Sequence, residues 1–472
     1  MEAPMTANDN ETGGGEEVRA EIYNEDGAIR QDFIARITDA IEGQDADTLK
    51  SEVSVLHQSE IGDLLEALPA EARRSLVVLM GDEFDFAALT EVDEAIRLDI
   101  VEHLPNAQIA QAVQELDSDD AVYILEDLDR EDQDEILEQL PFTERIRLRR
   151  SLDYPEETAG RRMQTEFVAV PPFWTVGQTI DYLREDKNLP DSFPQIFVVD
   201  PTFRLMGAVD LDRILRSQRT VRIEDVMHET RHAIPATMDQ EEAAQEFEQY
   251  DLLSAAVVDE NERLVGVLTI DDVVDVIQEE AEEDLLRMGG VGDEELSDSV
   301  RTTSRSRVPW LLINLVMAFL AASVIGLFDA TIQEIVALAI LMPIVAGMGG
   351  NAASQTMTVT VRALATRDLD IYNAGRIIRR EMGVGLINGL LFAVLVGGIA
   401  AFWFSNDIGL VIATAMLINL FTAAVAGILV PLLLDKVGAD PAVASAVFVT
   451  TITDVVGFFA FLGLATWWFG LL

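Results

Sequence analysis

The chain has 472 residues, a formal net charge of −50 and no cysteine. This length predicts several domains, and the missing cysteines exclude disulfides, thiol catalysis and cysteine-bound metal centres. The excess of 83 acidic over 33 basic residues argues against nucleic acid as a partner, because phosphate binding needs a basic surface. It favours cationic partners, or a solubilising acidic surface of the kind that a salt-adapted organism would also show.

The N-terminal part begins with a tail and continues with a short repeat. Residues 1–28 are polar and acidic, which predicts a disordered tail, and they hold no apolar run suited to a secretory signal. Over residues 29–153, Leu-Pro or Leu-Asp pairs precede acidic and then apolar residues, and the last four pairs are evenly spaced. The pairs are Leu68-Pro69, Leu104-Pro105, Leu116-Asp117, Leu128-Asp129 and Leu140-Pro141.

Asp accepts hydrogen bonds from the free N–H groups at a helix start, and Pro suits the first helical turn. The repeat therefore predicts an all-α superhelical domain of short helices, none of them stable alone. The carboxylates of this domain either bind cations or form a solvated acidic face.

A longer repeat fills residues 154–272. The segment Phe-Val-Val-Asp at 197–200 returns as Ala-Val-Val-Asp at 256–259. Each copy, about 154–217 and 218–272, predicts the order strand, helix, strand, turn, strand, helix. The pair resembles an α+β CBS-domain tandem, a regulatory module. In that family the signature Gly266-x-x-Thr269-x-x-Asp272 of the second copy holds the ribose of a nucleotide such as ATP. The first copy departs from it, with Asp210 and Arg213 at the matching positions.

Residues 273–305 predict an acidic connecting helix and linker. Five carboxylates crowd neighbouring faces of this helix, and like charges at helical spacing repel by a few tenths of a kcal/mol per pair. They are Glu279, Glu280, Glu282, Glu283 and Asp284. Bound cations would offset that repulsion, although a plain solvated linker helix has the same pattern.

Residues 306–472 predict a transmembrane domain. Five apolar stretches, at about 308–328, 335–361, 382–404, 408–434 and 441–470, are each long enough to cross a bilayer. Basic residues gather before the first span and between the second and third, which predicts that the N-terminal part is cytoplasmic and the C-terminus outside. They are Arg301, Arg305, Arg307, Arg362, Arg367, Arg376, Arg379 and Arg380.

Polar residues inside the spans are the candidates for an ion pathway, because ionisable groups at membrane depth are costly. Asp454 lies well inside the span that begins at Pro441, with Thr450 and Thr451 one turn before it. In the second span, Gly347, Asn351, Ser354 and Thr358 fall on one helical face, close to Gly350 and Gln355. Asn388 and Asn419 add one polar group each to the third and fourth spans, and either could simply join helices.

In this order, the short-helix domain, CBS pair, acidic helix and five spans resemble the MgtE family of magnesium channels and transporters. The motifs that carry the resemblance are Pro-x-x-x-Gly-x-Gly-Gly-Asn-x-x-x-Gln at 343–355, Asp440-Pro441-Ala442, and Thr-x-x-Asp-x-x-Gly at 451–457. The resemblance implies a homodimer in a cell (inner) membrane, with one pore for hydrated Mg²⁺ at the two-fold axis. The implied pore residues are Asp454, Thr450, Thr451, Gly347, Gly350, Asn351, Gln355 and Asp440.

The resemblance also implies that cytosolic Mg²⁺ closes the pore by binding to the acidic domains. The matching carboxylates are Asp239, Glu241, Asp251, Asp272, Asp275, Glu280, Glu283 and Asp284, with Asp117, Asp119 and Asp120 as candidates in the short-helix domain. A transporter of another divalent cation, such as Mn²⁺ or Co²⁺, and a membrane-anchored sensor remain alternatives. An enzyme is not expected, because the sequence offers no nucleophile–base pair, phosphate loop or metal–histidine cluster.

Overall fold

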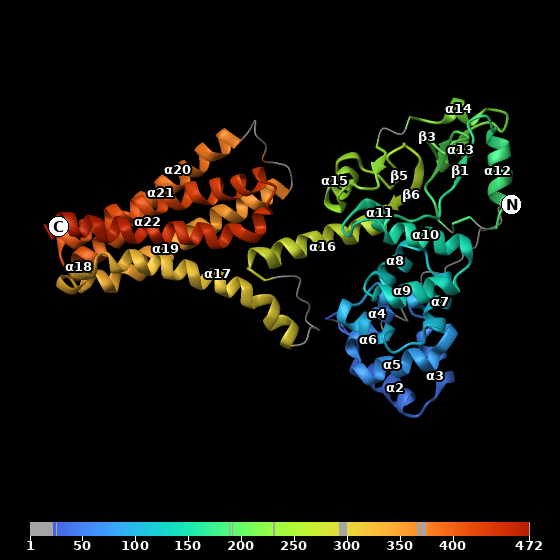
Figure 1. The fold of residues 1–472 in the computed structure, drawn as a ribbon, viewed down its shortest axis with the longest axis horizontal. Coiled ribbons are helices and arrows are strands. Elements are labelled where there is room, and N and C mark those ends of the chain that lie inside the picture. Colours follow the sequence, from blue (N-terminus) through green and yellow to red (C-terminus); the bar gives the residue numbers. More distant parts are fainter. Residues whose placement is uncertain are drawn as a thin grey trace, which may run out of the picture. The chain divides into compact units, whose positions relative to one another are not determined.

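The computed structural model describes residues 22–471, except 25, 188, 191, 230, 231, 292–299, 366–368 and 370–373, and except the side chains of 443–445. The chain divides into two compact units, one up to Ile277 and one from Gln278. Figure 1 shows short helices and two small sheets in the first unit and long helices in the second.

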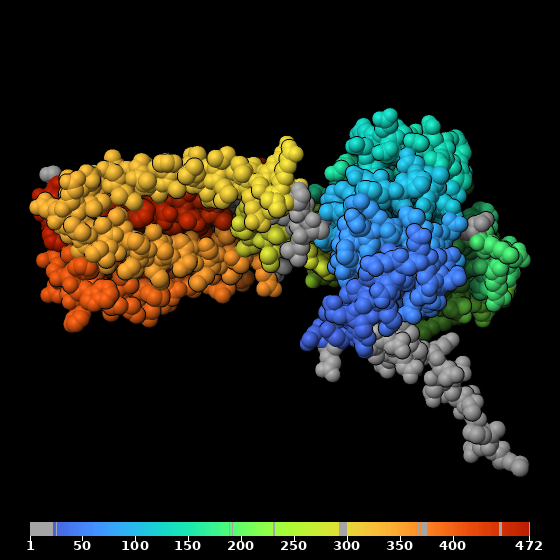
Figure 2. All heavy atoms as spheres, turned by 90° about the horizontal axis from the view of Figure 1, so that it is seen from below, coloured from blue at the N-terminus to red at the C-terminus, as the bar shows by residue number. Residues whose placement is uncertain are grey.

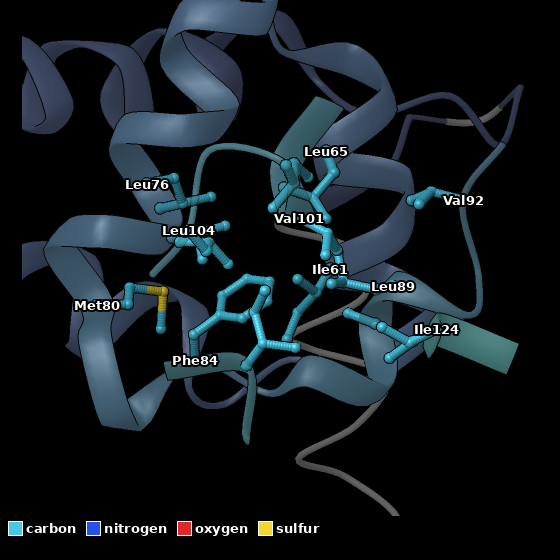
Figure 3. Packing of buried hydrophobic residues seen from close by; sticks show 14 of the residues in the cluster. Ile61, Leu65, Leu76, Met80, Phe84, Leu89, Val92, Val101, Leu104 and Ile124 are labelled. Atoms are coloured by element: carbon cyan, nitrogen blue, oxygen red, sulfur yellow. The ribbon is translucent and has the colours of Figure 1, made fainter. Parts of the chain in front are cut away.

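The first unit begins with a chain of short helices. They are α2 (Gln31–Glu42), α3 (Ala46–Val53), α4 (Gln58–Ala67), α5 (Ala70–Met80), η1 (Gly81–Glu83), η2 (Phe86–Leu89), α6 (Glu94–Val101), α7 (Asn106–Glu115), α8 (Ser118–Glu126), α9 (Arg130–Gln139) and α10 (Phe142–Leu152). Their apolar side chains form one continuous core, and Figure 3 shows that several helices contribute to it, with Ile61, Leu76 and Ile124 among the labelled residues. Each helix is too short to be stable alone, so the shared core holds the set together.

The Leu-Pro and Leu-Asp pairs do mark helix starts, as predicted. Helices α5, α7, α8, α9 and α10 each begin directly after one of the pairs. The leucines Leu68, Leu104 and Leu140 are buried. The expected capping hydrogen bonds are wrong in detail, because the side chains of Asp117 and Asp129 at the N-cap positions accept none from their helices. Burial of the leucine, together with the fixed backbone angle of proline, positions these turns.

Of the expected tail, residues 1–21 lie outside the described residues. Ile22 is buried in the helical core, and the Tyr23 hydroxyl donates to Asp63 at 2.6 Å. The ordered chain therefore begins before residue 29.

The CBS pair follows, and both copies have the predicted order of elements. After α11 (Ala159–Arg162), the first copy holds β1 (Ala169–Val170), α12 (Val176–Glu185), β2 (Gln195–Val199), β3 (Leu205–Asp210) and α13 (Leu211–Arg216). After α14 (Ile223–Val226), the second holds β4 (Ile234–Pro235), α15 (Gln240–Tyr250), β5 (Ser254–Val258), β6 (Leu264–Thr269) and α16 (Ile270–Met288).

Each copy forms a three-stranded sheet, in the orders β1-β2-β3 and β4-β5-β6. The first two strands of each sheet are parallel and the last two antiparallel. The copies meet where the Leu205 N–H donates to the Glu262 carbonyl and the Leu264 N–H donates to the Phe203 carbonyl, both at 3.0 Å. Helix α16 continues directly from β6, as the unbroken acidic sequence predicted.

The second unit contains all five predicted spans. They are α17 (Val300–Gly326), α19 (Ala337–Ala365), α20 (Ala374–Trp403), α21 (Asn406–Lys436) and α22 (Pro441–Trp468), each long and apolar enough to cross a membrane. The sequence did not predict the short helix α18 (Asp329–Glu334). A hydrogen bond of 2.9 Å between the hydroxyls of Thr331 and Thr466 joins this helix to α22. The chain is therefore a multi-pass membrane protein. Helix α21 packs against α19, α20 and α22, which places it at the centre of the bundle.

Candidate functional site

The second span has one apolar and one polar face. Val345, Gly349 and Ala353 lie buried against the bundle. The opposite face carries the predicted polar residues on the surface of the unit. Gly347, Asn351, Ser354, Gln355 and Thr358 are all exposed. The sequence predicted this shared face from helical spacing, and the structure adds that it points away from the core of the subunit.

Helix α22 brings Asp454 to the edge of the same surface. Thr450 is exposed and Asp454 is half-buried. A methyl group added at Gly350 of α19 would lie 4.0 Å from Cγ2 of Thr450, so the polar edges of α19 and α22 adjoin. Figure 2 shows α22, in red, reaching the surface of this unit in a groove beside α17 and α19. No charged side chain in the described part of the chain interacts with Asp454.

The hydroxyls next to Asp454 are partly engaged by their own helix. Thr451 Oγ1 donates to the Val447 carbonyl at 2.7 Å, and Thr453 Oγ1 donates to the Thr450 carbonyl at 2.8 Å. Thr453 is buried, whereas Thr451 keeps its hydroxyl oxygen as an acceptor near the edge, and the Asp454 carboxylate is the strongest acceptor there. Such a surface suits a hydrated cation better than an anion.

Asp440 starts the helix that carries Asp454. Its Oδ1 accepts from the Ala442 N–H at 2.7 Å, and its Oδ2 accepts from Nη1 of Arg287 at 2.9 Å. Arg287, on the last turn of α16, also pairs with Glu283. Burial, and then the neighbouring Asp440 carboxylate, raise the pKa of Asp284. The end of the connecting helix is thus attached by charge to the first turn of α22.

A second group of carboxyls lies inside the first unit, where α8 meets the start of α16. Asp119 is 9% exposed, and its Oδ1 has no hydrogen-bond partner among the described residues. Burial, followed by the nearby Asp272 and Asp120 carboxyls, raises the pKa of Asp119 well above its usual range. Burial and Asp272 likewise raise the pKa of Asp120 to about 7. We call Asp119, Asp120 and Asp272 the acidic triad.

The acidic triad is held together although its members repel one another. The carboxyls of Asp119 and Asp272 lie close enough to interact directly, which favours a proton on one of the two. Burial raises the pKa of Asp272, against the hydrogen bond that it accepts from Thr269. Asp275, on the next turn of α16, is exposed and has Glu91 and Asp271 as charged neighbours. A cation would replace the proton and satisfy the free Oδ1, so these residues suit one.

The other predicted regulatory carboxylates have local roles. Asp239 caps α15 by accepting from the Glu241 N–H at 2.9 Å, and Glu241 accepts from the Gln245 side chain at 3.1 Å. Asp251 ends α15 in the left-handed conformation, with φ of 51°. Glu280 is half-buried on α16. In the described ranges, no three acidic or histidine side chains stand at metal-ligating positions. Mg²⁺ keeps most of its waters, so it does not need such a preformed cage.

Farther along the same face of α8, which also carries Asp119, the helix makes attractive contacts that sequence reasoning missed. The Tyr123 ring lies between two guanidinium groups, with Arg97 at 4.2 Å and Arg162 at 5.2 Å from its centre. Arg161 pairs with Glu126 at 3.4 Å. At the start of α8, Ser118 Oγ accepts from the Thr165 N–H at 2.7 Å. Helix α8 is therefore attracted to the CBS pair at Ser118, Tyr123 and Glu126 and repelled by it at the acidic triad.

The predicted nucleotide residues are engaged with each other. Thr269 Oγ1 donates to Asp272, whose carboxyl also faces Asp119. In the first copy, Asp210 stands where the nucleotide signature has a hydroxyl, and it lies 3.5 Å from Nε2 of His228. Neither copy presents a free hydroxyl–carboxylate pair to a ribose in this arrangement.

Five membrane helices with a carboxylate on a polar edge, joined to a CBS pair, define a membrane transport protein with a regulatory module. The profile of the MgtE family, described as a divalent cation transporter, matches residues 342–464. The MgtE intracellular N domain matches residues 56–157, and the CBS domain matches residues 223–279.

Two relatives are each named magnesium transporter MgtE. The one from Bacillus subtilis (strain 168) is 29% identical over 420 residues, which is 88% of this chain and 93% of the relative. The one from Enterococcus faecalis is 34% identical over 316 residues, or 67% of this chain and 70% of the relative. A solved cytosolic domain of the Mg²⁺ channel MgtE in complex with ATP is 26% identical, with a TM-score of 0.48, over 52% of this chain and 99% of that domain. The chain belongs to the MgtE family, as its motifs indicated.

The raised pKa values predict how stability depends on pH. The pKa of Asp120 is about 7 in the fold and near 3.8 when unfolded, so the folded state binds more protons between these values. The contribution of Asp120 to stability is then fully present below about pH 4 and is lost as the pH rises through about 7. In a metal-chelating buffer, we expect the melting temperature to fall from pH 5 to pH 8, and millimolar Mg²⁺ to reduce that fall.

Paired variants separate this effect from the general acidity of the chain. Asp119→Asn with Asp120→Asn should flatten the pH dependence. Glu131→Gln with Asp132→Asn, which neutralises two exposed carboxylates of α9, should keep it. A slope that is equal in both paired variants would contradict the assignment to the acidic triad.

Proposed function

We propose that this protein carries Mg²⁺ across the membrane through a pore formed by two copies of the chain. The observation that supports this most is the exposed polar edge of α19 and α22. Asn351, Gln355 and Thr450 are exposed at positions where a lone subunit would meet lipid. Polar groups facing hydrocarbon are costly, whereas the same groups facing a water-filled path or a second subunit are satisfied.

A two-fold arrangement would turn these edges toward each other and place two Asp454 carboxylates on one axis. A ring of acidic side chains selects cations. Mg²⁺ gives up its waters reluctantly. A site whose carboxylates, hydroxyls and backbone carbonyls contact the hydrated ion therefore avoids the free-energy cost of dehydration. The names of the relatives favour Mg²⁺ over Mn²⁺ or Co²⁺ as the cargo.

The proposed gate uses the acidic triad. Asp119 and Asp120 on α8 and Asp272 and Asp275 on α16 would hold a divalent cation from the cytosolic side. With their charges neutralised, these residues keep α8 against the CBS pair, and without a cation their repulsion loosens that contact. Because α16 ends at the Arg287–Asp440 ion pair, its position is linked to the start of the pore helix α22.

Orientation and nucleotide binding are part of the same proposal. The described basic residues at the starts of α17 and α20 and the end of α19 support a cytoplasmic N-terminal part. Nucleotide binding by Thr269 and Asp272 would require α8 to leave Asp272, so ATP and the closed acidic triad would exclude each other. A membrane-anchored sensor without transport is the second candidate, but it gives no reason for the polar edge at membrane depth.

Asp454→Asn should abolish divalent flux. In proteoliposomes that contain purified protein, Mg²⁺ uptake by this variant is expected to fall to the rate of empty liposomes, because the neutral amide no longer balances the charge of the ion. Asp435→Asn is the matched control, since Asp435 is exposed at the end of α21, and it should transport like the wild type. Uptake that does not depend on Asp454 would place the pathway elsewhere.

Asp119→Asn with Asp120→Asn should produce a transporter that cytosolic Mg²⁺ no longer closes. The Mg²⁺ concentration for half block is expected to rise by at least about tenfold, which corresponds to roughly 1.4 kcal/mol of binding energy. Asp272→Asn, Asp275→Asn and Glu283→Gln together should act in the same way from α16. Glu131→Gln with Asp132→Asn serves as the control. Unchanged block in the first two variants would refute the gate.

A further inference from the structure

One buried amide lies between the helices that carry the polar edge. Asn419 of α21 is fully buried, and it is the only buried polar side chain that the structure describes in that helix. Its Nδ2 donates to the Val345 carbonyl of α19 at 2.8 Å. Its Oδ1 has no hydrogen-bond partner among the described residues.

Two glycines make room for this amide. A methyl group added at Gly457 of α22 would lie 2.7 Å from Nδ2 of Asn419, and one added at Gly349 of α19 would come closer still. Neither position would accept a larger residue without moving the amide. Asn419 therefore touches both helices of the polar edge, at a glycine in each.

The contact is level with the candidate ion pathway. Gly349 precedes Asn351 by two residues, and Gly457 follows Asp454 by three residues. At about 1.5 Å per residue, these offsets are about 3 Å and about 4.5 Å along the two helices. A shift of the amide would therefore move Asn351 and Asp454 relative to each other.

An apolar side chain of similar size in place of Asn419 would avoid the free-energy cost of burying an unpaired polar atom. A buried carbonyl oxygen without a donor costs roughly 1–3 kcal/mol, and the neighbours Met416 and Leu420 are apolar and buried. Packing alone therefore does not account for the asparagine. A hydrogen bond that fixes the register of α19 against α21 does account for it, because apolar contacts are less directional.

We propose that Asn419 is a positioning residue for the ion pathway. It holds α19 and α22 at the spacing that sets the polar edge, and so it determines the affinity and selectivity of the pathway for divalent cations. This inference rests on the proposed transport function.

The test compares Asn419→Leu with Asn388→Leu in proteoliposomes. Asn388 is an exposed asparagine of α20, so it controls for the loss of an amide. For each protein, Mg²⁺ and Mn²⁺ uptake is measured over a range of concentrations, with folded protein quantified by its melting transition. For Asn419→Leu we expect the half-saturating Mg²⁺ concentration to rise, and Mg²⁺/Mn²⁺ discrimination to fall, by roughly three- to tenfold, the equivalent of one interhelical hydrogen bond.

A purely structural role would give a different result. It would lower maximal uptake in proportion to folded protein and leave half-saturation and discrimination at the wild-type values, and that result would overturn the inference. If Asn419→Leu does not fold, Asn419→Ala carries the same expectation, since it removes the amide without adding bulk beside Gly349 and Gly457. A wild type without any divalent uptake would overturn the proposed function itself, whereas an active wild type with unaltered Asn419 variants would overturn this inference alone.

Discussion

A carboxyl group removed from water needs a proton, a hydrogen-bond donor or a cation, and the functional regions of this protein depend on that requirement. Asp119 is buried against other carboxyls, with one oxygen unpartnered among the described residues. Asp454 is half-buried in a membrane helix with no charged neighbour in the described part of the chain. In both places the described side chains satisfy the carboxyl group only in part. A mobile divalent cation meets that need, and this links the proposed transport to the proposed regulation.

Helix α8 combines a stable contact with a conditional one. The contact of Tyr123 with Arg162, together with the Glu126–Arg161 pair, attaches α8 to the CBS pair. The acidic triad, one turn earlier on the same face, opposes that attachment. Under the proposed gate, an element that is attracted and repelled at once would have two arrangements of similar free energy, and a cation at the triad would select between them. The short helices around α8 share one core, so they would move with it rather than separately.

Much of the fold was predictable, because it follows from periodicity and length. The spans follow from uncharged stretches of bilayer length, the CBS copies from a repeated strand pattern, and the short helices from leucines followed by Pro or Asp. The polar face of the second span was also predictable, since helical spacing alone places Gly347, Asn351 and Thr358 together. Small elements such as α18 were missed because six residues carry too little pattern.

The site was predictable only in part, because burial and partners depend on the tertiary structure. Asp117, Asp119 and Asp120 are equivalent in the sequence, yet only Asp119 is buried. Asp440 stays a predicted pore residue, and its contacts with the Ala442 N–H and with Arg287 could not be read from the sequence. The significance of Asn419 depends on two glycines, Gly349 and Gly457, which lie far from it in the chain on either side. No local pattern indicates such a contact.

The proposed gate is tested most directly by measuring the distance between the short-helix domain, which contains α8, and the CBS pair with and without Mg²⁺. The chain has no cysteine. Spin labels on a variant with Val78→Cys and Leu215→Cys therefore mark only these two positions, which are exposed on α5 and α13. Pulsed electron resonance on the full-length protein should give one narrow distance distribution in Mg²⁺ and a broader, longer one in chelator. Adding Asp119→Asn and Asp120→Asn should keep the distribution narrow without Mg²⁺. Distributions that are the same with and without Mg²⁺ in the wild type would contradict the account.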